Sequence, residues 1–453
     1  MNKPTRHRET RTILAISLPL IAAYVAEMGM MITDMIIVGR LGSNELAAVG
    51  LTADFFYVLL LLGMGVVSIV GVLVAQNFGA DNKAGITDAV EQGVIAATIM
   101  SIPVMLLVWY LGPVLEYAKQ DKEVIRLITD YSRPLTWTVL PALWFVVFRN
   151  FVTALAKSSV IMTITIVALL LNLALNYTLV FGKFGFPALG VVGAAYGTTL
   201  VHWLIFLFLA VHVCTSERFA DYQIAIIPRR INYKTLKEIF VLGLPVTVTQ
   251  MLAGTMFTFA AILVGTISAD VLAAQMIIYS VIYLAFSIPV ALGDAVRVRI
   301  AYGIGMRSAD AARQSGHISF FLAITTIFIA SSVLWIFPEF LVGIFLDVTD
   351  MVNTSVLGLS LGLSVYAGWF LFFDGVLIVA ANAIRGLRDT RSPLWISMIG
   401  YWVIGLGVGA WLCFPLGYGV IGLWWALIFG SVFGNVLMFW RFYVRLAQVE
   451  DRL

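Results

Sequence analysis

Long apolar segments alternate with short polar ones along the whole chain. Hydrophobic runs of roughly 20 residues, the length that crosses a bilayer as a helix, lie at 13–38, 50–76, 90–112, 132–155, 160–181, 190–213, 240–265, 275–300, 317–337, 357–384, 393–413 and 419–442. These runs are rich in Leu, Ile, Val and Ala and lack the two-residue alternation of barrel strands. The pattern predicts an all-α polytopic membrane protein with twelve transmembrane helices.

Composition agrees with this pattern and excludes other classes. Of the 453 residues, 61% are hydrophobic and 12% are charged, whereas soluble domains carry about 25% charge. The net charge of +3 does not indicate nucleic-acid binding, because most Lys and Arg residues fall on one side of the predicted topology. If that side is the cytoplasm, the positive-inside rule places both termini there. The basic start of the chain precedes a run of full span length, which favours a first helix over a cleaved signal peptide.

The two halves of the chain resemble each other at one constant offset. SLPL at Ser17–Leu20 aligns with GLPV at Gly243–Val246, and the segments after Val38 and Ala75 align with those after Val264 and Ala301. Each half holds six predicted spans, so both begin on the same side of the membrane. Parallel repeats of this kind occur in secondary transporters, which bind substrate and ions near the bilayer midplane.

The repeat predicts two lobes, an N-lobe at 1–213 and a C-lobe at 240–453, joined by a cytoplasmic linker at 214–239. Pro19 and Pro245 occupy matching places in the first span of each lobe. A proline removes a helical hydrogen bond and allows bending, which suits alternating access. An equally weighted alternative is that these prolines only shape the helix entry.

Asp34 lies within a long apolar run, where a carboxylate costs several kcal/mol unless it faces a partner, a cavity or a bound cation. The polar residues predicted to share a cation site with it are Glu27, Asn172, Asn176, Thr198 and Thr199. Glu27 is two turns earlier on the same helix face, so the two acids are expected to titrate as a pair. Carboxylate, amide and hydroxyl oxygens could hold Na⁺ or share a proton. Asn172 and Asn176 could instead bridge helices only.

Asp374 repeats this situation in the second half, directly after Phe372 and Phe373. A carboxylate beside aromatic rings suits an amphipathic cation. Met31 and Gln250 complete the residues predicted to contact a drug, although many such side chains must face lipid or pack. Asp294 is interpreted differently: Arg297 and Arg299 follow it near the cytoplasmic end of its span, which favours an ion pair or a solvated helix end over a functional site.

Catalytic patterns are missing from the sequence. The four His residues have no metal-ligand spacing, and no ATP-binding P-loop motif occurs. Cys214 and Cys413 lie in different halves, so neither a disulfide nor a metal site is expected. Two intramembrane aspartates could suggest an aspartyl protease, but they lie in the two lobes of a repeat and lack the Gly-rich motif of such enzymes.

Several motifs together resemble a known family. VGRLGSNELAAVG after Asp34, VAQNFGA, LNLALNYTLVFGKFGFPALGVVGAAYGT and DGVLIVAANAIRGLRDT are similar to the multidrug and toxic compound extrusion (MATE) family, especially its NorM-like bacterial branch. The resemblance covers nearly the whole chain. It implies two six-helix bundles around a V-shaped cavity, and antiport of amphipathic drugs against Na⁺ or H⁺ in the bacterial inner membrane. No cofactor besides the coupling ion, no enzymatic activity and a monomer are expected.

The resemblance also assigns roles by position. Asp34 matches the cation-site acid of the N-lobe, Asn172 and Asn176 match its partners, and Asp374 matches the acid of the C-lobe. NorM-like proteins often carry a Glu where this chain has Ala253, with Gln250 the nearest polar residue, and Glu27 stands where a Gln is common. The second carboxylate is therefore expected in the N-lobe. The alternatives are a flippase for lipid-linked precursors, whose cavities are usually basic, and a non-transporting membrane scaffold or sensor.

Overall fold

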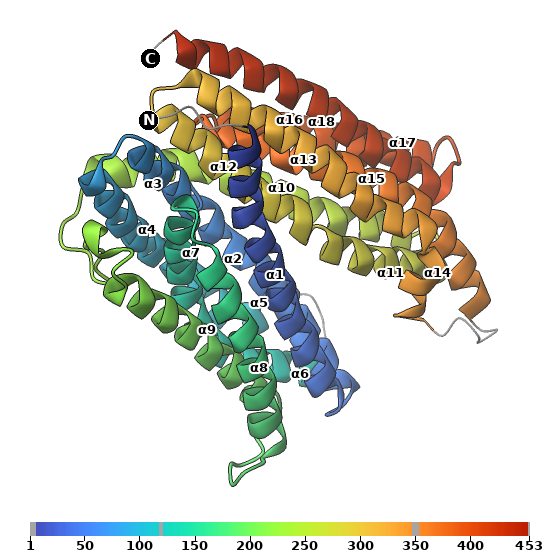
Figure 1. The fold of residues 1–453 in the computed structure, drawn as a ribbon. Helices are drawn as coiled ribbons and strands as arrows, with labels where there is room; N and C mark the ends of the chain where they lie inside the picture. The colour runs from blue at the N-terminus through green and yellow to red at the C-terminus, as the bar shows by residue number, and fades with distance from the viewer. Residues whose placement is uncertain (1–5, 117–120, 347–352, 452–453) are drawn as a thin grey trace. The chain divides into compact units, whose positions relative to one another are not determined.

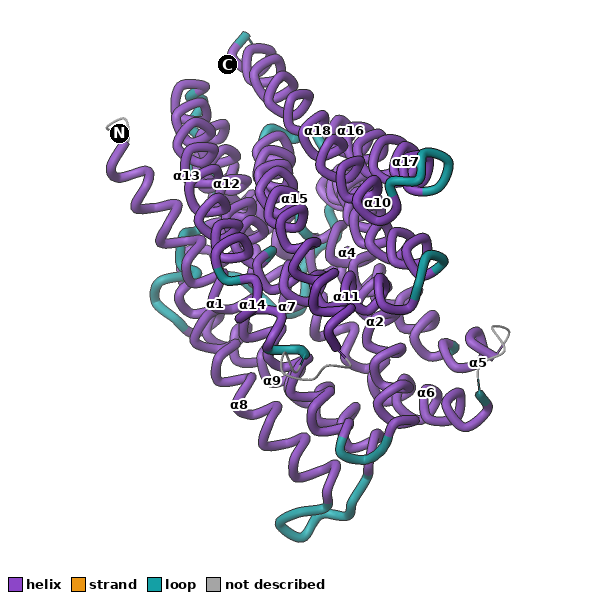
Figure 2. The backbone as a smooth tube through the Cα atoms, turned by 90° about the vertical axis from the view of Figure 1, so that its right-hand side faces the viewer, coloured by secondary structure: helices purple, strands orange, loops and turns teal. Residues whose placement is uncertain are grey.

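The described residues of the computed structural model, 6–116, 121–346 and 353–451, form helices joined by short loops, and no strand occurs among them (Figures 1 and 2). The outermost residues of both predicted lobes lie outside these ranges. The elements of the first half are α1 (Arg6–Gly39), α2 (Ser43–Val67), α3 (Ile69–Gly79), α4 (Lys83–Trp109), α5 (Leu111–Glu116), α6 (Lys122–Leu135), the 3₁₀ turn η1 (Thr136–Thr138), α7 (Val139–Ala154), α8 (Ser159–Phe181), α9 (Gly190–Thr215) and η2 (Ala220–Tyr222).

The second half continues with the same kind of element. It contains α10 (Tyr233–Gly265), α11 (Ala269–Ala285), α12 (Ser287–Gly305), α13 (Ala309–Ile336), α14 (Pro338–Gly343), α15 (Thr354–Gly386), α16 (Arg391–Ser397), the π-helix η4 (Met398–Val408), α17 (Gly409–Cys413) and α18 (Gly419–Glu450).

The prediction of twelve spans is confirmed. The described residues contain 12 helical stretches that are long and apolar enough to cross a membrane, and each overlaps one predicted window. Several stretches are longer than predicted, because a helix continues past the hydrocarbon layer into the headgroup region. There its own backbone bonds remain satisfied while polar side chains reach water. Arg6–Gly39 and Gly419–Glu450 are extended in this way.

The chain divides into two compact units. The N-terminal unit is Leu18–Thr247, and the C-terminal unit combines Met1–Ser17 with Val248–Leu453. α1 and α10 therefore each contribute residues to both units. Pro19 and Pro245 lie inside these two helices, within three residues of the points where the assignment changes from one unit to the other.

Within the N-terminal unit, α8 packs closely against α9 because α9 presents glycines to it. A side chain at Gly193 would meet the backbone oxygen of Leu179 at 2.6 Å, and one at Gly197 would collide with Asn176. The Gly193-xxx-Gly197 spacing thus serves close helix packing, as is typical of membrane helices. It also positions an amide that belongs to the candidate site.

Within the C-terminal unit, the eleventh span is not a regular α-helix. Its central part, η4, is a π-helix of 11 residues, a form that is rare and mostly confined to single turns at functional sites. Backbone atoms of Gly400 in η4 and Gly430 in α18 approach so closely that neither position has room for a side chain. This packing places Tyr401 beside α15.

Candidate functional site

The carboxylate of Asp34 is buried in the N-terminal unit with only 9% of the residue exposed. It projects from α1 toward α8 and α9. Asn176 Nδ2 donates a hydrogen bond to Asp34 Oδ1, and Thr198 Oγ1 donates one to Asp34 Oδ2 at 3.0 Å. The structure thus brings together an acid, an amide and a hydroxyl that were predicted to meet from three separate helices.

Asn176 has a second feature of interest. The residue is fully buried, and its Oδ1 has no hydrogen-bond partner among the described residues. An unsatisfied buried carbonyl oxygen costs about 1–3 kcal/mol. Here it lies on the same amide group that contacts the carboxylate, so it is an available acceptor beside a negative charge.

Thr198 and Thr199 point in different directions, although both were predicted at this site. Successive helical residues are separated by about 100°, so only one of them can face Asp34. Thr199 Oγ1 shares a hydrogen bond with Thr138 Oγ1 at 2.8 Å and donates another to Pro134 O at 3.1 Å. The structure therefore places Thr198 on the carboxylate and gives Thr199 a role in joining α9 to η1 and α6.

Asn172 lies one turn before Asn176 on α8 and is almost fully buried. Its Oδ1 accepts a hydrogen bond from Thr33 Oγ1 at 3.1 Å, and the residue interacts with Asp34 as well. Tyr131 on α6 is also buried and interacts electrostatically with Asp34. The sequence analysis missed Thr33 and Tyr131, because neither interrupts an apolar run conspicuously.

Glu27 is on α1 but has a different partner from the one expected. Arg149 Nη1 of α7 donates to Glu27 Oε1 at 3.2 Å, and the Arg149 guanidinium also lies over the rings of Tyr24 and Phe145, 5.1 and 5.8 Å from their centroids. The side chains are 12% exposed for Arg149 and 33% for Glu27. Glu27 is thus neutralised by an arginine that the sequence analysis missed, although a lone charge in the run FVVFRNFV was a usable signal.

Asn176 meets Asp34 through its Nδ2 atom, but the atoms near Asp34 that could bind a cation are oxygens of the carboxylate, the amides and the hydroxyl. Carboxylate, amide and hydroxyl oxygens suit hard cations such as Na⁺, and a carboxylate can bind a proton instead. Among the described residues, no group of three or more His, Cys, Asp or Glu is placed to hold a metal ion. The chemistry here fits exchange of Na⁺ or H⁺ and does not resemble a transition-metal site.

Asp374 is a second buried carboxylate, 4% exposed, in the C-terminal unit. Its Oδ1 accepts hydrogen bonds from Tyr401 Oη of η4 at 2.8 Å and from Ser431 Oγ of α18 at 3.2 Å. Asn435, one turn after Ser431, donates to the Phe373 backbone oxygen at 2.7 Å, and its buried Oδ1 has no partner within the described ranges. The atoms that contact the Asp374 carboxylate directly are hydroxyl oxygens.

The aromatic residues beside Asp374 in sequence face other partners. Phe372 packs edge-on against Phe328 of α13, with ring centroids 5.9 Å apart, and Phe373 stacks on Trp369 at 6.0 Å. The contacts of Asp374 described above are instead with hydroxyls, because adjacent helical positions point in different directions. The contacts of the Asp374 carboxylate and those of the two rings are thus with different groups, and a drug contact shared by this acid and Phe372 and Phe373 stays a prediction.

The remaining predicted residues lie on the first helices of the two halves. Met31 on α1 is 47% exposed. Gln250 on α10 is partly buried, and its Oε1 meets no hydrogen-bond partner in the described part of the chain. Their contact with a drug stays a prediction. The predicted ion pair of Asp294 with Arg297 is confirmed at 2.9 Å, and both cysteines are free.

Comparisons with known proteins place this geometry in context. The MatE family model matches residues 19–178 and 245–411, so it matches once in each half, beginning at Pro19 and Pro245. "Probable multidrug resistance protein NorM" of Rhizobium meliloti is 32% identical over 97% of this chain and 94% of its own length. "Multidrug resistance protein NorM" of Burkholderia vietnamiensis is 32% identical over 98% of this chain and 96% of its own.

Solved structures share the fold. A eukaryotic MATE transporter, AtDTX14, matches with a TM-score of 0.85 at 20% identity, covering 99% of both chains. An outward-facing multidrug resistance MATE family transporter of the MOP superfamily matches with a TM-score of 0.88 at 18% identity, covering 98% of this chain and 97% of that one. With a family model that matches most of its length and relatives above 30% identity, this chain belongs to the MatE family of multi-pass membrane proteins.

Proposed function

We propose that this protein exports amphipathic, often cationic drugs in exchange for Na⁺ or H⁺. The observation that carries the proposal is the buried Asp34 carboxylate, held between Asn176 and Thr198 with an unsatisfied amide oxygen beside it. The relatives' names, multidrug resistance proteins, support drugs as the transported class.

The mechanism follows from reversible binding of the coupling cation at one carboxylate. A cation that reaches Asp34 neutralises it and is held by the surrounding oxygens; when the cation leaves, the acid is again a buried charge. Coupling requires only that cation and drug favour different conformations of the transporter. A monovalent cation that moves down a membrane potential gains about 2.3 kcal/mol per 100 mV, so the potential helps to drive export of a neutral drug. Exchange for a drug with one positive charge moves no net charge and is driven by the concentration gradient of the ion alone.

Pro19 and Pro245 are suited to the conformational part of this cycle. Each removes one backbone hydrogen bond from a long helix, and each lies near the place where that helix passes from one compact unit to the other. In the proposal, bending at Pro19 conveys occupancy of Asp34 along α1. Both termini are cytoplasmic, and the membrane is the bacterial inner membrane.

The C-lobe acid has a subsidiary part in this proposal. Because Tyr401 and Ser431 already donate to Asp374, a second ionisable site is a better interpretation of this acid than a drug contact between aromatic rings. Asp374→Asn should then reduce export of cationic and neutral drugs alike. A loss confined to cationic drugs would restore the drug-contact role.

Ethidium efflux tests the proposed function. Vesicles containing the purified protein are loaded with ethidium and given an imposed Na⁺ gradient, an imposed proton gradient, or neither. The proposal expects efflux with at least one gradient and none without. Gradient-independent efflux, or no efflux with either ion, contradicts it. Movement of a lipid-linked precursor instead of ethidium favours a flippase, and movement of neither favours a scaffold.

A further inference from the structure

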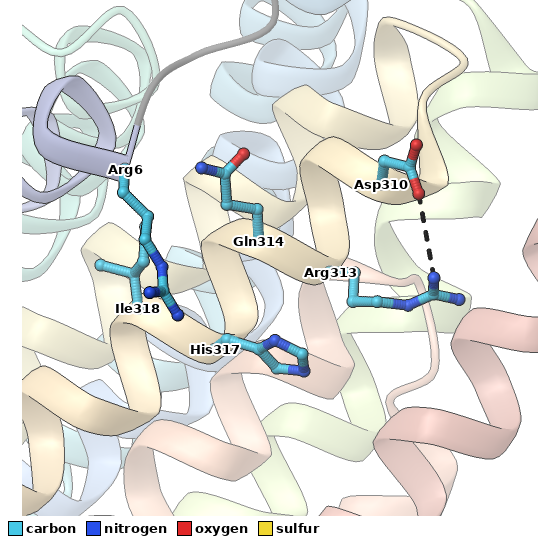
Figure 3. Close-up of a pocket in the computed structure, with 6 residues that line it drawn as sticks. All are labelled: Arg6, Asp310, Arg313, Gln314, His317 and Ile318. Carbon is cyan, nitrogen blue, oxygen red and sulfur yellow. Dashed lines mark ion pairs between the residues drawn. The ribbon is translucent and has the colours of Figure 1, made fainter.

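The first turn of α1 and the first turns of α13 line an open cavity of about 290 Å³ in the C-terminal unit. Figure 3 shows the residues that line it: Arg6 from α1, and Asp310, Arg313, Gln314, His317 and Ile318 from α13. Four of these six side chains can donate hydrogen bonds from nitrogen. The cavity is therefore lined by hydrogen-bond donors from two helices.

The charges around the cavity are unevenly satisfied. Arg313 Nη2 contacts Glu450 Oε2 of α18 at 2.7 Å, and its Nη1 lies 3.8 Å from Asp310 Oδ1. Arg6, by contrast, has no side-chain partner among the described residues; only its backbone oxygen is used, by Thr10 Oγ1. Among the residues that the structure describes, the Arg6 guanidinium thus has no counter-ion, although it lines the cavity.

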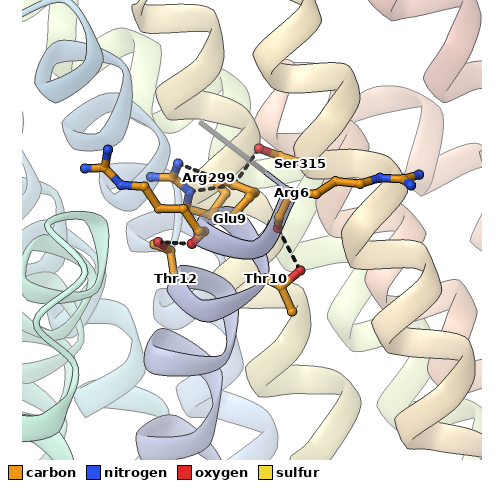
Figure 4. A network of polar contacts seen from close by, with 7 residues as sticks. Arg6, Glu9, Thr10, Thr12, Arg299 and Ser315 are labelled. Carbon is orange, nitrogen blue, oxygen red and sulfur yellow. Dashed lines mark hydrogen bonds and ion pairs between the residues drawn. The ribbon is translucent and has the colours of Figure 1, made fainter. Parts of the chain in front are cut away.

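The neighbouring acid on α1 cannot neutralise Arg6. Glu9 is 1% exposed and accepts hydrogen bonds from Arg299 Nε at 2.8 Å, from Arg299 Nη2 at 2.7 Å and from Ser315 Oγ at 2.7 Å (Figure 4). Its carboxylate is satisfied by these three donors. An anion that pairs with Arg6 must therefore come from outside this network.

The face of α13 that carries the cavity residues becomes apolar farther along the helix. Positions 310, 313, 314, 317, 321, 324 and 328 recur at helical spacing and share one face. Phe321, Ile324 and Phe328 are exposed by 69%, 45% and 47%. From His317 to Phe328 the helix rises roughly 16 Å, about the depth of one hydrocarbon leaflet. A basic cavity followed by an exposed apolar stripe of this length matches a ligand with an anionic head and an acyl chain.

We infer that this cavity binds the phosphate of an anionic phospholipid, with Arg6, Gln314 and His317 contacting the headgroup and an acyl chain lying along Phe321, Ile324 and Phe328. Basic pockets at the ends of transmembrane helices are known sites for such headgroups. A free phosphate would use the donors but leave the stripe uncovered. In this inference the bound lipid contacts both α13 and the start of α1, close to Glu9. The same helix, α1, carries Asp34 farther along.

Retention of lipid by the purified protein tests this inference directly. Detergent-solubilised wild-type protein is equilibrated with an equimolar mixture of phosphatidylglycerol and phosphatidylcholine of identical chains, and the lipids kept on the intact protein are counted by native mass spectrometry. The double variant Arg6→Gln with His317→Gln leaves the Arg313–Glu450 pair intact. We expect the wild type to retain more phosphatidylglycerol than phosphatidylcholine. In the variant the ratio of the two retained lipids should fall at least about fivefold, the effect of one arginine at a membrane surface.

Arg307→Gln is the matched control. Arg307 is exposed at the same end of α13 and carries the same charge, but it does not line the cavity. Equal retention of the two lipids by the wild type, or an equal loss in Arg307→Gln, overturns the inference. Complete competition by millimolar inorganic phosphate would assign the cavity to a soluble anion. Since no ion gradient is applied, the result is independent of the proposed drug transport.

Discussion

Gly197 on α9 leaves the space that Asn176 on α8 occupies next to Asp34. A Cβ at position 197 would collide with Asn176 Oδ1, while Asn176 Nδ2 donates to the Asp34 carboxylate. Close packing of two helices and the geometry of the candidate cation site therefore depend on the same glycine.

Gly197→Ala should displace the Asn176 amide and impair cation coupling. We expect a loss of stability of about 1–3 kcal/mol, as is usual when a packed interior is overfilled, together with a weaker dependence of efflux on the ion gradient. Gly362→Ala is the control, because Gly362 lies in helix α15 with no atom within 4 Å of an added Cβ. Unchanged ion dependence in Gly197→Ala would show that Asn176 is not part of the site.

The two adjacent threonines of α9 allow a paired test. Thr198→Val removes the hydroxyl that donates to Asp34, and we expect the cation concentration for half-maximal efflux to rise roughly two- to tenfold, the effect of losing one hydrogen bond. Thr199→Val removes bonds to Thr138 and Pro134 instead. It should lower the melting temperature without changing the cation requirement. The opposite pattern would mean that the two side chains have been assigned to the wrong partners.

The Glu27–Arg149 pair predicts a double-mutant cycle. Either Glu27→Gln or Arg149→Gln removes this ion pair and should cost about 1–2 kcal/mol of stability, a modest value because Glu27 is one-third exposed. The double variant should recover part of this loss. Additive losses in thermal unfolding would argue against a direct pair. If Glu27→Gln alone shifts the pH optimum of efflux, Glu27 titrates together with Asp34, as the sequence predicted.

Asp389 lies between α15 and α16, outside the membrane spans, and its contacts predict that the stability of the protein depends on pH. Burial alone would raise the pKa of this carboxyl, but hydrogen bonds from Ser392 N, Ser392 Oγ and Arg441 Nε outweigh burial and lower it. A lowered pKa means stabilisation that is complete above the ordinary carboxyl range and is lost as the pH falls through the folded-state pKa. Asp389→Asn should therefore lower the melting temperature at pH 7. The difference in melting temperature between wild type and variant should become smaller in acid. A constant gap would contradict this assignment.

Much of the fold was predictable, because hydropathy determines which segments cross a membrane. The division into compact units was not, since it depends on which neighbours the ends of α1 and α10 pack against. Pro19 and Pro245 were visible as repeated features, but their position near the change of unit follows only from tertiary contacts.

The candidate site was predictable to a similar degree. Asp34 was conspicuous because a carboxylate in an apolar run needs a reason, and amides at helical spacing identified Asn172 and Asn176. The sequence could not show which of Thr198 and Thr199 faces Asp34, because that depends on how α9 is rotated about its axis. Arg149 is more than one hundred residues from Glu27, so no local pattern connects them. Tyr401 reaches Asp374 from a π-helix, a form that apolar sequence does not reveal.

The central claim is that Asp34 couples cation movement to drug export, and the Asp34→Asn variant tests it most directly. Equilibrium drug binding and gradient-driven transport are measured on the same purified variant, with Asp54→Asn, an exposed acid on α2, as the control. We predict near-normal drug binding and no transport driven by a Na⁺ or H⁺ gradient in Asp34→Asn, and both activities intact in Asp54→Asn. Full gradient-driven transport by Asp34→Asn would contradict the account.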